Sequence, residues 1–197
     1  MSLPENPALN PTYRADLRRV RMAAREAIPA DRHAQLSAAV HEHLQRLLAS
    51  RSPGVLAFCW PIRAEFDCRP LARQLIDRGW QSCIPTVVEG GAPMEFRAWT
   101  PNSTMAVDRH GIPVPADGAT LIPDVVLLPL VAFDAKGFRL GYGGGYFDRT
   151  LAVITPRPLA IGVGFEVARV DSIQPQAHDI PLDVVVTEVG VNSYAPR

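Results

Sequence analysis

PDVVLLPLVAFDAKGFRLGYGGGYFDR, residues 123–149, contains the features that decide the fold. Residues 125–130 are the most apolar segment of the chain, and a continuous apolar run of this length predicts a central strand buried on both faces of a parallel sheet. Four of the five residues from 141 to 145 are glycine, although glycine costs up to ~1 kcal/mol in the interior of a helix or strand. We therefore expect a loop that needs glycine for its backbone shape.

A glycine-rich loop that opens a helix is typical of an anion site, because successive amide N–H groups converge on the ligand and the helix dipole adds to the attraction. Residues 146–153 are predicted to form that helix. The common nucleotide fingerprints do not fit: the chain has no Lys-Ser or Lys-Thr pair, and Tyr146 stands where the dinucleotide pattern needs its third glycine. Arg139 and Arg149 supply cations beside the loop, and Asp148 supplies an oxygen ligand suited to Mg²⁺. The alternative is a loop that is merely flexible.

Further apolar segments alternate with helical patterns on both sides of this stretch. The other predicted strands span residues 55–60, 80–88, 94–99, 159–165 and 184–188, the last of them ending the sheet. A helix predicted over residues 70–78 completes a βαβ unit, and residues 101–118 are predicted to be a loop region rich in Pro and Gly. We expect one α/β domain over residues 1–197, with an open, mainly parallel sheet of about five or six strands flanked by helices.

Two helices are predicted before the first strand. The first spans about residues 11–28, starting at Asn10 and Pro11, and the second, amphipathic helix spans about residues 31–50. The first helix places four guanidinium groups on one face, those of Arg14, Arg18, Arg21 and Arg25. This basic face is either solvated, with partial balance from Asp16 and Glu26, or a clamp for phosphate or carboxylate.

Composition excludes several classes of protein. The 20 basic residues balance the 20 acidic ones, which argues against a nucleic-acid or anionic-membrane binder. No apolar run approaches the ~18 residues of a membrane span, and the N-terminal segment does not resemble a secretory signal, so we expect a cytoplasmic protein. Cys59, Cys68 and Cys83 lack the spacing of a zinc site or disulfide framework. Of the three, Cys68 has a weak claim to reactivity.

Together these motifs resemble the 5-formyltetrahydrofolate cyclo-ligases, also called methenyltetrahydrofolate synthetases. The likeness is centred on residues 123–149 and extends to RADLR at 14–18, residues 60–67, IPTV at 84–87, GIP at 111–113 and HDIPLDVVVTE at 178–188. It therefore covers nearly the whole chain. The glycine segment is the specific part of the resemblance, since the other motifs are weak alone.

The resemblance implies a ligase of one-carbon metabolism that uses ATP and Mg²⁺ to convert 5-formyltetrahydrofolate to 5,10-methenyltetrahydrofolate, with release of ADP and phosphate. A formamide oxygen is a poor leaving group, so the γ-phosphoryl group is transferred to it before N10 attacks the formyl carbon. Catalysis of this kind consists mainly of positioning and charge neutralisation. The expected partners are 5-formyltetrahydrofolate and ATP, and no nucleic acid or membrane is expected to bind. The protein is expected to be a monomer.

Carried over residue by residue, the resemblance places ATP on Arg14 and Arg18 of the first helix and on the glycine segment. The ATP-binding positions in that segment are Arg139, Leu140, Gly141, Tyr142, Gly143, Gly144, Gly145, Tyr146 and Phe147. Asp148 and Asp183 are the implied Mg²⁺ ligands. No residue is assigned to catalysis.

Trp60 and Glu65 match the folate-binding positions of the family, the indole for stacking and the carboxylate for bidentate hydrogen bonding to a pterin ring. Both residues, and the implied metal ligand Asp183, have plainer interpretations. Trp60 could be a core aromatic, Glu65 an ordinary acidic residue of a turn, and Asp183 a cap before the last strand. His178 and Asp179 are not expected to form a catalytic pair, because adjacent residues rarely orient one another in that way.

The sequence departs from the usual pattern of the family at four places. The family usually has Gly at Leu130, Glu at Val114, Lys at Arg14 and Gln within residues 168–170. Arginine at position 14 preserves the charge of lysine but not its shape. Two alternatives therefore stay open: a diverged paralogue that phosphorylates another amide-like small molecule, and a non-catalytic protein that binds nucleotide or folate.

Overall fold

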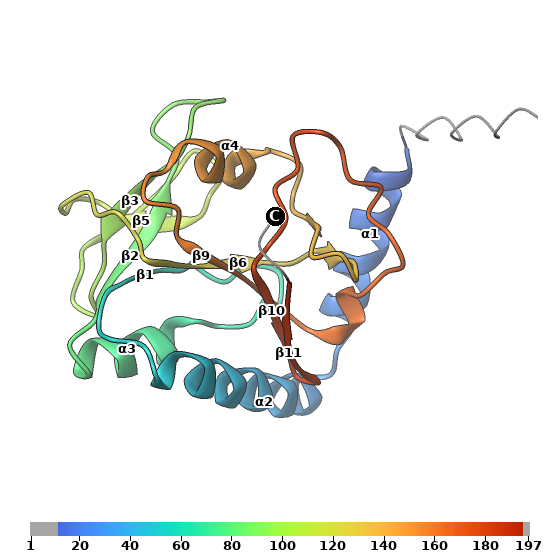
Figure 1. Cartoon of the computed structure of the whole chain (residues 1–197), viewed down its shortest axis with the longest axis horizontal. Helices are drawn as coiled ribbons and strands as arrows, with labels where there is room; N and C mark the ends of the chain where they lie inside the picture. The colour runs from blue at the N-terminus through green and yellow to red at the C-terminus, as the bar shows by residue number, and fades with distance from the viewer. Residues whose placement is uncertain (1–11, 195–197) are drawn as a thin grey trace, which may run out of the picture.

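A seven-stranded sheet forms the centre of the protein in a computed structural model that describes residues 12–194 (Figure 1). The strands of this sheet are β1 (Val55–Ala57), β2 (Gln81–Thr86), β3 (Glu95–Ala98), β6 (Val125–Pro129), β9 (Leu159–Val163), β10 (Val184–Thr187) and β11 (Gly190–Ser193). Their order is β11-β10-β9-β6-β1-β2-β3. The five inner strands pair in parallel, whereas β3 and β11 are antiparallel edge strands. The prediction of an open, mainly parallel α/β sheet is confirmed.

The strand count differs from the prediction because the chain turns back after β10. Residues 184–188 were expected to end the sheet, but a turn at 188–189 returns the chain as β11, whose residues alternate between partly buried and exposed. Residues 101–118, predicted as a loop, contain a short hairpin of β4 (Met105–Val107) and β5 (Pro113–Pro115). A second short pair, β7 (Ala132–Phe133) and β8 (Arg139–Leu140), precedes the glycine loop.

Helices cover both faces of the sheet. They are α1 (Tyr13–Glu26), α2 (Ala30–Ala49), α3 (Arg69–Asp77) and α4 (Tyr146–Val153), with a single 3-10 turn, η1 (Glu166–Ala168). In Figure 1, α2 and α3 lie below the sheet and α4 lies above it, while α1 stands at one end beside η1. The N-terminal start predicted at Asn10 and Pro11 lies outside the described residues. Within the part of the chain that is described, no helix is long and apolar enough to cross a bilayer.

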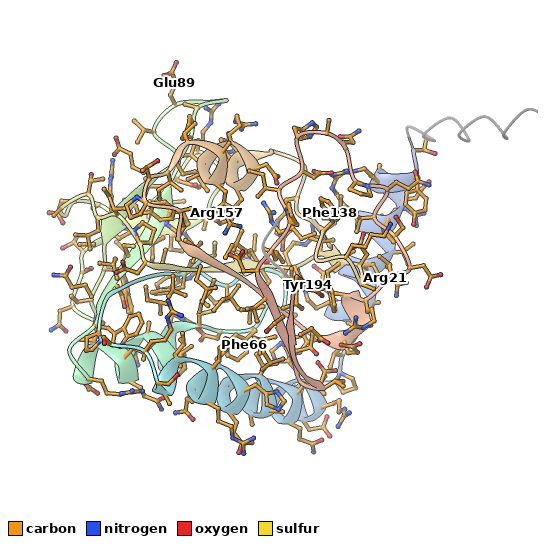
Figure 2. All side chains as sticks on the ribbon, in the orientation of Figure 1. Arg21, Phe66, Glu89, Phe138, Arg157 and Tyr194 are labelled. Carbon is orange, nitrogen blue, oxygen red and sulfur yellow. The ribbon has the colours of Figure 1, made fainter. Side chains whose placement is uncertain are left out.

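The two faces of the sheet bury different side chains because successive residues of a strand point to opposite sides. In β6, Val125 and Leu127 pack against the buried face of α2, whereas Val126 and Leu128 pack on the side of Leu151 in α4. Figure 2 shows Phe66 in the layer between the sheet and α2, where it belongs to the first of these clusters. The continuous apolar run of residues 125–130 is therefore explained by burial on both sides.

Cys68 and Cys83 are buried in these layers. Burial, followed by the charges of Asp67 and Glu65, raises the pKa of the Cys68 thiol, and burial alone raises the pKa of Cys83 to about 12. A thiolate is the nucleophilic form of cysteine. The weak claim of Cys68 to reactivity is therefore wrong, and Cys68 acts as a small apolar core residue.

Candidate active site

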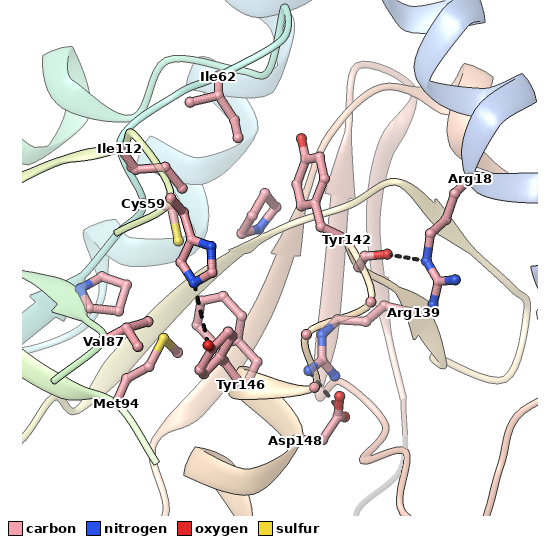
Figure 3. A pocket seen from close by; sticks show the side chains of 18 of the residues that line it. Arg18, Cys59, Ile62, Val87, Met94, Ile112, Arg139, Tyr142, Tyr146 and Asp148 are labelled. Atoms are coloured by element: carbon pink, nitrogen blue, oxygen red, sulfur yellow. Dashed lines mark hydrogen bonds and ion pairs between the residues drawn. The ribbon is translucent and has the colours of Figure 1, made fainter. Parts of the chain in front are cut away.

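A cavity of about 700 Å³ lies at the carboxyl edge of the parallel strands (Figure 3). The strand order reverses at β1, which has β2 on one side and β6 on the other, and such a switch point is where open α/β sheets bind their ligands. Cys59 and Trp60 follow β1, Pro129 ends β6, and all three line the cavity. Residues 141–145, called the glycine loop below, form a second wall together with the start of α4.

The glycine loop has the backbone shape that its sequence predicts. Gly143 and Gly145 have φ angles of 102° and 64°, in a region that side chains with a Cβ rarely adopt. Gly145 is the N-cap of α4, and no side chain caps this helix among the described residues, so its first amide N–H groups are available to an anion. At Gly141, apart from the glycine itself and its two chain neighbours, no described atom lies within 4 Å of the position that a Cβ would take. Space for a ligand therefore lies directly against the backbone there.

The four arginines of α1 point into the protein and not into solvent. They donate to backbone carbonyls: Arg14 to Gln174 at 3.3 Å, Arg18 to Gly141 at 2.8 Å, Arg21 to Val167 at 3.1 Å, and Arg25 to Arg63 and Leu130, both at 2.9 Å. The interpretation of this face as solvated is therefore wrong. Arg14 and Arg18 line the cavity beside the glycine loop, as the anion-clamp interpretation expects, whereas Arg25 is buried behind the wall.

Arg14 is held by Asp179 in a bidentate ion pair. Its Nη1 and Nη2 donate to the two carboxylate oxygens at 2.5 and 3.0 Å, and the Asp179 side chain is only 4% exposed. Burial acts to raise the pKa of Asp179, but hydrogen bonds from Arg14 and the Gln176 amide outweigh it, so this pKa lies below its ordinary value. His178 is exposed and its Nε2 lies 3.9 Å from Asp179. The expectation that these two neighbours form no catalytic pair stays a prediction.

Arg139 and Asp148 form the floor below the glycine loop (Figure 3). The buried Arg139 donates to the Ile180 carbonyl at 2.9 Å and to Asp148 Oδ1 at 3.1 Å. Burial lowers the pKa of Arg139, and the charge of Asp148 opposes this change. The Ile180 amide also donates to Oδ1 of Asp148, at 3.0 Å. Since both hydrogen bonds end on Oδ1, Oδ2 is the oxygen of this carboxylate left for a cation.

Glu65 projects from a strained turn at the opposite end of the cavity. The two residues before it, Arg63 and Ala64, have positive φ angles of 50° and 56°, which are uncommon outside glycine and cluster at functional sites. The Glu65 carboxylate accepts the Ile62 amide at 3.0 Å and the Tyr142 hydroxyl at 2.5 Å. Burial raises the pKa of Glu65, and these hydrogen bonds with the charge of Arg25 offset only part of the rise. An ordinary, solvated turn acid would have neither the burial nor these partners.

Trp60 also lines the cavity and is partly buried against the core. The guanidinium carbon of Arg69 lies 4.4 Å from the centre of its ring, and Asp67 holds Arg69 through hydrogen bonds of 2.8 and 2.9 Å. Trp60 is therefore a core aromatic that also lines the cavity, and its role in stacking on folate stays a prediction.

Asp183, the second carboxylate expected at the metal site, does not line the cavity. It accepts hydrogen bonds from the Ala160 amide at 2.8 Å and from Arg157 at 2.8 and 3.1 Å. The structure thus places Asp183 as a bridge between β9 and the start of β10, close to its plainer interpretation as a cap. Figure 2 shows Arg157, its partner. The carboxylate that this segment brings to the cavity is Asp179.

Sequence reasoning missed the wall formed by the β4–β5 hairpin. His110 at its tip lines the cavity, and its Nε2 lies 3.3 Å from the hydroxyl of Tyr146 (Figure 3). Met94 and Ile112 complete an apolar side of the cavity next to this pair. The Gly-Ile-Pro motif at 111–113 was the available signal, but it lies in a segment without regular apolar alternation.

The departures from the family pattern lie away from the cavity, except at Arg14. Leu130, Val114 and Ala168 are buried in the core and do not line the cavity. The Leu130 side chain lies against Gly162 and Gly164, where an added Cβ would come within 2.8 and 3.2 Å of it. Leucine at position 130 therefore fills space that these two glycines leave open, which is a change of core packing.

Fold and cavity together define an α/β protein whose cavity is lined by a glycine-rich loop, by arginines and by a buried carboxylate. The model of the 5-formyltetrahydrofolate cyclo-ligase family matches residues 11–188. The chain belongs to this family.

Individual relatives agree with this assignment. The 5-formyltetrahydrofolate cyclo-ligase of Escherichia coli K12 is 35% identical over 130 residues, 62% of this chain and 71% of the relative. The Haemophilus influenzae enzyme of the same name is 27% identical over 160 residues, 77% and 86% of the two chains. The NMR structure of Aquifex aeolicus 5,10-methenyltetrahydrofolate synthetase matches with a TM-score of 0.80 at 28% identity, covering 93% of this chain and 94% of that one.

Replacing Asp179 with Asn should lower the free energy of unfolding at neutral pH by about 1.5–3 kcal/mol, because a charge-assisted pair with Arg14 is lost. Since the pKa of Asp179 is lowered on folding, its contribution is present above the ordinary pKa and disappears as pH falls. The difference from wild type should therefore begin to shrink below about pH 4 and vanish once pH lies below the pKa of folded Asp179. Denaturant unfolding across pH measures it. Asp16→Asn, which breaks the exposed Arg19–Asp16 pair of the same helix, should change little; equal effects would contradict the special role of Asp179.

Proposed function

We propose that the protein is an ATP-dependent cyclo-ligase that converts 5-formyltetrahydrofolate to 5,10-methenyltetrahydrofolate, with release of ADP and phosphate. The observation that carries the proposal is the presence of two chemically different ends in one cavity. Gly141, Arg18 and the start of α4 offer cationic and N–H groups to phosphates at one end. Glu65 and Trp60 offer a buried carboxylate and an indole to a heterocycle at the other.

The reaction needs both substrates in contact. A bond forms between the formyl oxygen and the γ-phosphorus while the bond from that phosphorus to the ADP oxygen breaks. N10 then attacks the formyl carbon, loses its proton and expels phosphate, which closes the ring. The chain contributes positioning and charge neutralisation to these steps, which is the usual contribution of a protein to phosphoryl transfer. No side chain is assigned as the base that accepts the N10 proton.

The arginines available to the phosphates differ in whether a carboxylate already pairs with them. Arg18 uses only Nε in a hydrogen bond to the described residues, at Gly141, so its two Nη groups are free to bind phosphate. Arg139 and Arg14 are paired with Asp148 and Asp179 and act chiefly by keeping the glycine loop and its surroundings in place. We therefore assign the main phosphate contact to Arg18 with the loop amides, and supporting roles to Arg14 and Arg139.

The residues of the cavity fit a magnesium ion that arrives with the nucleotide. Residues 12–194 contain no group of three or more His, Cys, Asp or Glu side chains able to hold a metal by themselves. Mg²⁺ in nucleotide sites is usually held by one or two carboxylates together with phosphate oxygens and water. Asp148, with Oδ2 open, is the residue that would hold it, and the ion would neutralise phosphate charge there. We do not assign this role to Asp183.

Enzyme activity tests the proposal directly. Mixing protein, ATP, Mg²⁺ and 5-formyltetrahydrofolate should produce the absorbance of methenyltetrahydrofolate, with one ADP released per product. ADP release with other formamides but not with this folate would favour the diverged paralogue. Binding of either substrate without ADP release would favour the non-catalytic alternative. The monomeric state and the cytoplasmic location stay predictions.

Gly141→Ala should weaken ATP binding by about tenfold or more, because the new Cβ would occupy the space against which phosphate packs. The protein itself should tolerate the change, since apart from the glycine and its two chain neighbours no described atom lies within 4 Å of that Cβ. Nucleotide titration beside a thermal melt separates the two effects. Unchanged ATP affinity would remove the loop from the phosphate site, and a lowered melting temperature would show that the substitution acts on folding.

Asp148→Asn should reduce by about tenfold the factor by which Mg²⁺ strengthens ATP binding, because an amide keeps the shape of the side chain but lacks the charge that a hard cation needs. Calorimetric titration of ATP with and without Mg²⁺ gives this factor and cancels effects on ATP alone. Asp183→Asn is the matched control and should leave the factor unchanged. The opposite pattern would restore Asp183 as the metal ligand.

A further inference from the structure

One residue of the glycine loop belongs to both ends of the cavity. The backbone of Tyr142 lies between Gly141 and Gly143, within the segment assigned to phosphate. Its side chain points away from Arg139 and Asp148 (Figure 3), and its hydroxyl donates to Glu65 Oε1 at 2.5 Å. A hydroxyl that donates to a carboxylate at this distance makes a strong, charge-assisted hydrogen bond.

Arg25 fixes the direction of this hydrogen bond. Its Nη2 donates to the Tyr142 hydroxyl oxygen at 2.8 Å, so the hydroxyl proton is directed to Glu65. The same guanidinium lies 3.8 Å from Glu65 Oε1, and both side chains are no more than 6% exposed. The other oxygen of Glu65 accepts the Ile62 amide at 3.0 Å. The carboxylate is thus held from three elements: α1, the glycine loop and its own turn.

We propose that Tyr142 is a positioning residue for the folate substrate: its hydroxyl fixes both the orientation and the ionised state of Glu65. The proposal rests on the proposed function, in which the Glu65 carboxylate accepts hydrogen bonds from a pterin ring. An ionised carboxylate is acceptor-only, whereas a protonated one presents a donor and mismatches the ring. Folate binding should therefore depend on the hydroxyl of a residue that lies in the phosphate loop.

The charged and titratable groups around Glu65 set the direction of the pH effect. Arg25 on α1 and Tyr142 on the glycine loop favour its ionised form. Cys59 and Cys68, which interact with its charge, are neutral thiols because burial raises the pKa of each. Arg63 in the turn interacts chiefly with Glu26, which raises the pKa of Arg63, and only weakly with Tyr142. Burial raises the pKa of Glu65 and the hydrogen bond from Tyr142 lowers it, so loss of this hydroxyl should raise that pKa further.

Tyr142→Phe is the decisive variant, because it removes the hydroxyl and keeps the ring. The dissociation constant of 5-formyltetrahydrofolate, measured without nucleotide, should rise about tenfold or more at neutral pH. The carboxylate form is lost as pH falls through the pKa of Glu65, so the loss of folate binding in acid should begin at a higher pH in Tyr142→Phe than in the wild type. Tyr13→Phe is the control: it removes a hydroxyl that donates to the Ser172 carbonyl at 2.7 Å and not to Glu65, and the pH at which it loses folate binding should be that of the wild type.

A double-mutant cycle with Glu65→Gln separates positioning from a general effect on the loop. If Tyr142 acts through Glu65, Tyr142→Phe should cost little further affinity for 5-formyltetrahydrofolate in the Glu65→Gln background. The loss of binding that the wild type shows in acid should be shifted in Tyr142→Phe and absent in the variants that carry Glu65→Gln. Full additivity of the two losses of affinity, or an unshifted loss of binding in acid in Tyr142→Phe, overturns the role of Tyr142 while the proposed function stands. Failure of the wild-type protein to bind 5-formyltetrahydrofolate would instead overturn the proposed function.

Discussion

The buried guanidinium of Arg25 is the interaction on which the arrangement of the cavity depends. Its three nitrogens donate to three separate segments: the turn at Arg63, the chain after β6 at Leu130, and the glycine loop at Tyr142. A charge removed from water is tolerated only when its donors are bonded and a counter-charge is near, and Glu65 supplies that counter-charge. Because replacement of buried ion pairs by apolar groups is often neutral for stability, we interpret this one as a device that fixes geometry.

Strain in the turn before Glu65 is sustained by the same contacts. Two successive residues, Arg63 and Ala64, have positive φ angles, and each such residue costs of order 1–3 kcal/mol. Arg25 binds the carbonyl of Arg63, and His33 Nε2 donates to the carbonyl of Ala64 at 3.1 Å. Hydrogen bonds from α1 and α2 thus hold the backbone in a conformation that it would not adopt alone, and the result is a carboxylate directed into the cavity.

The parts of this structure that depend on local pattern could be predicted from sequence. The apolar run of β6 indicates burial on both faces, and the glycines before α4 indicate an unusual backbone shape, so the sheet and the glycine loop could be predicted from them. Elements without such a pattern were missed: the strand Met105–Val107 is largely exposed and has no apolar alternation. The choice between Asp179 and Asp183 was beyond sequence for a different reason. The two carboxylates lie four positions apart, and each is held by an arginine distant in sequence, Asp179 by Arg14 and Asp183 by Arg157.

Pairing of charges explains how a chain with no net charge can still present a site for phosphates. Among the described residues, Arg14 is matched by Asp179, Arg139 by Asp148 and Arg63 by Glu26, all within ion-pair distance. Among the described arginines that line this cavity, Arg18 is the one with no carboxylate within ion-pair distance, and its hydrogen bond goes to a neutral carbonyl. It lies beside the uncapped start of α4, whose dipole has the same sign. Attraction for an anion is thereby concentrated at one point of the cavity, and the far end, with Glu65, is left to a ligand that donates hydrogen bonds.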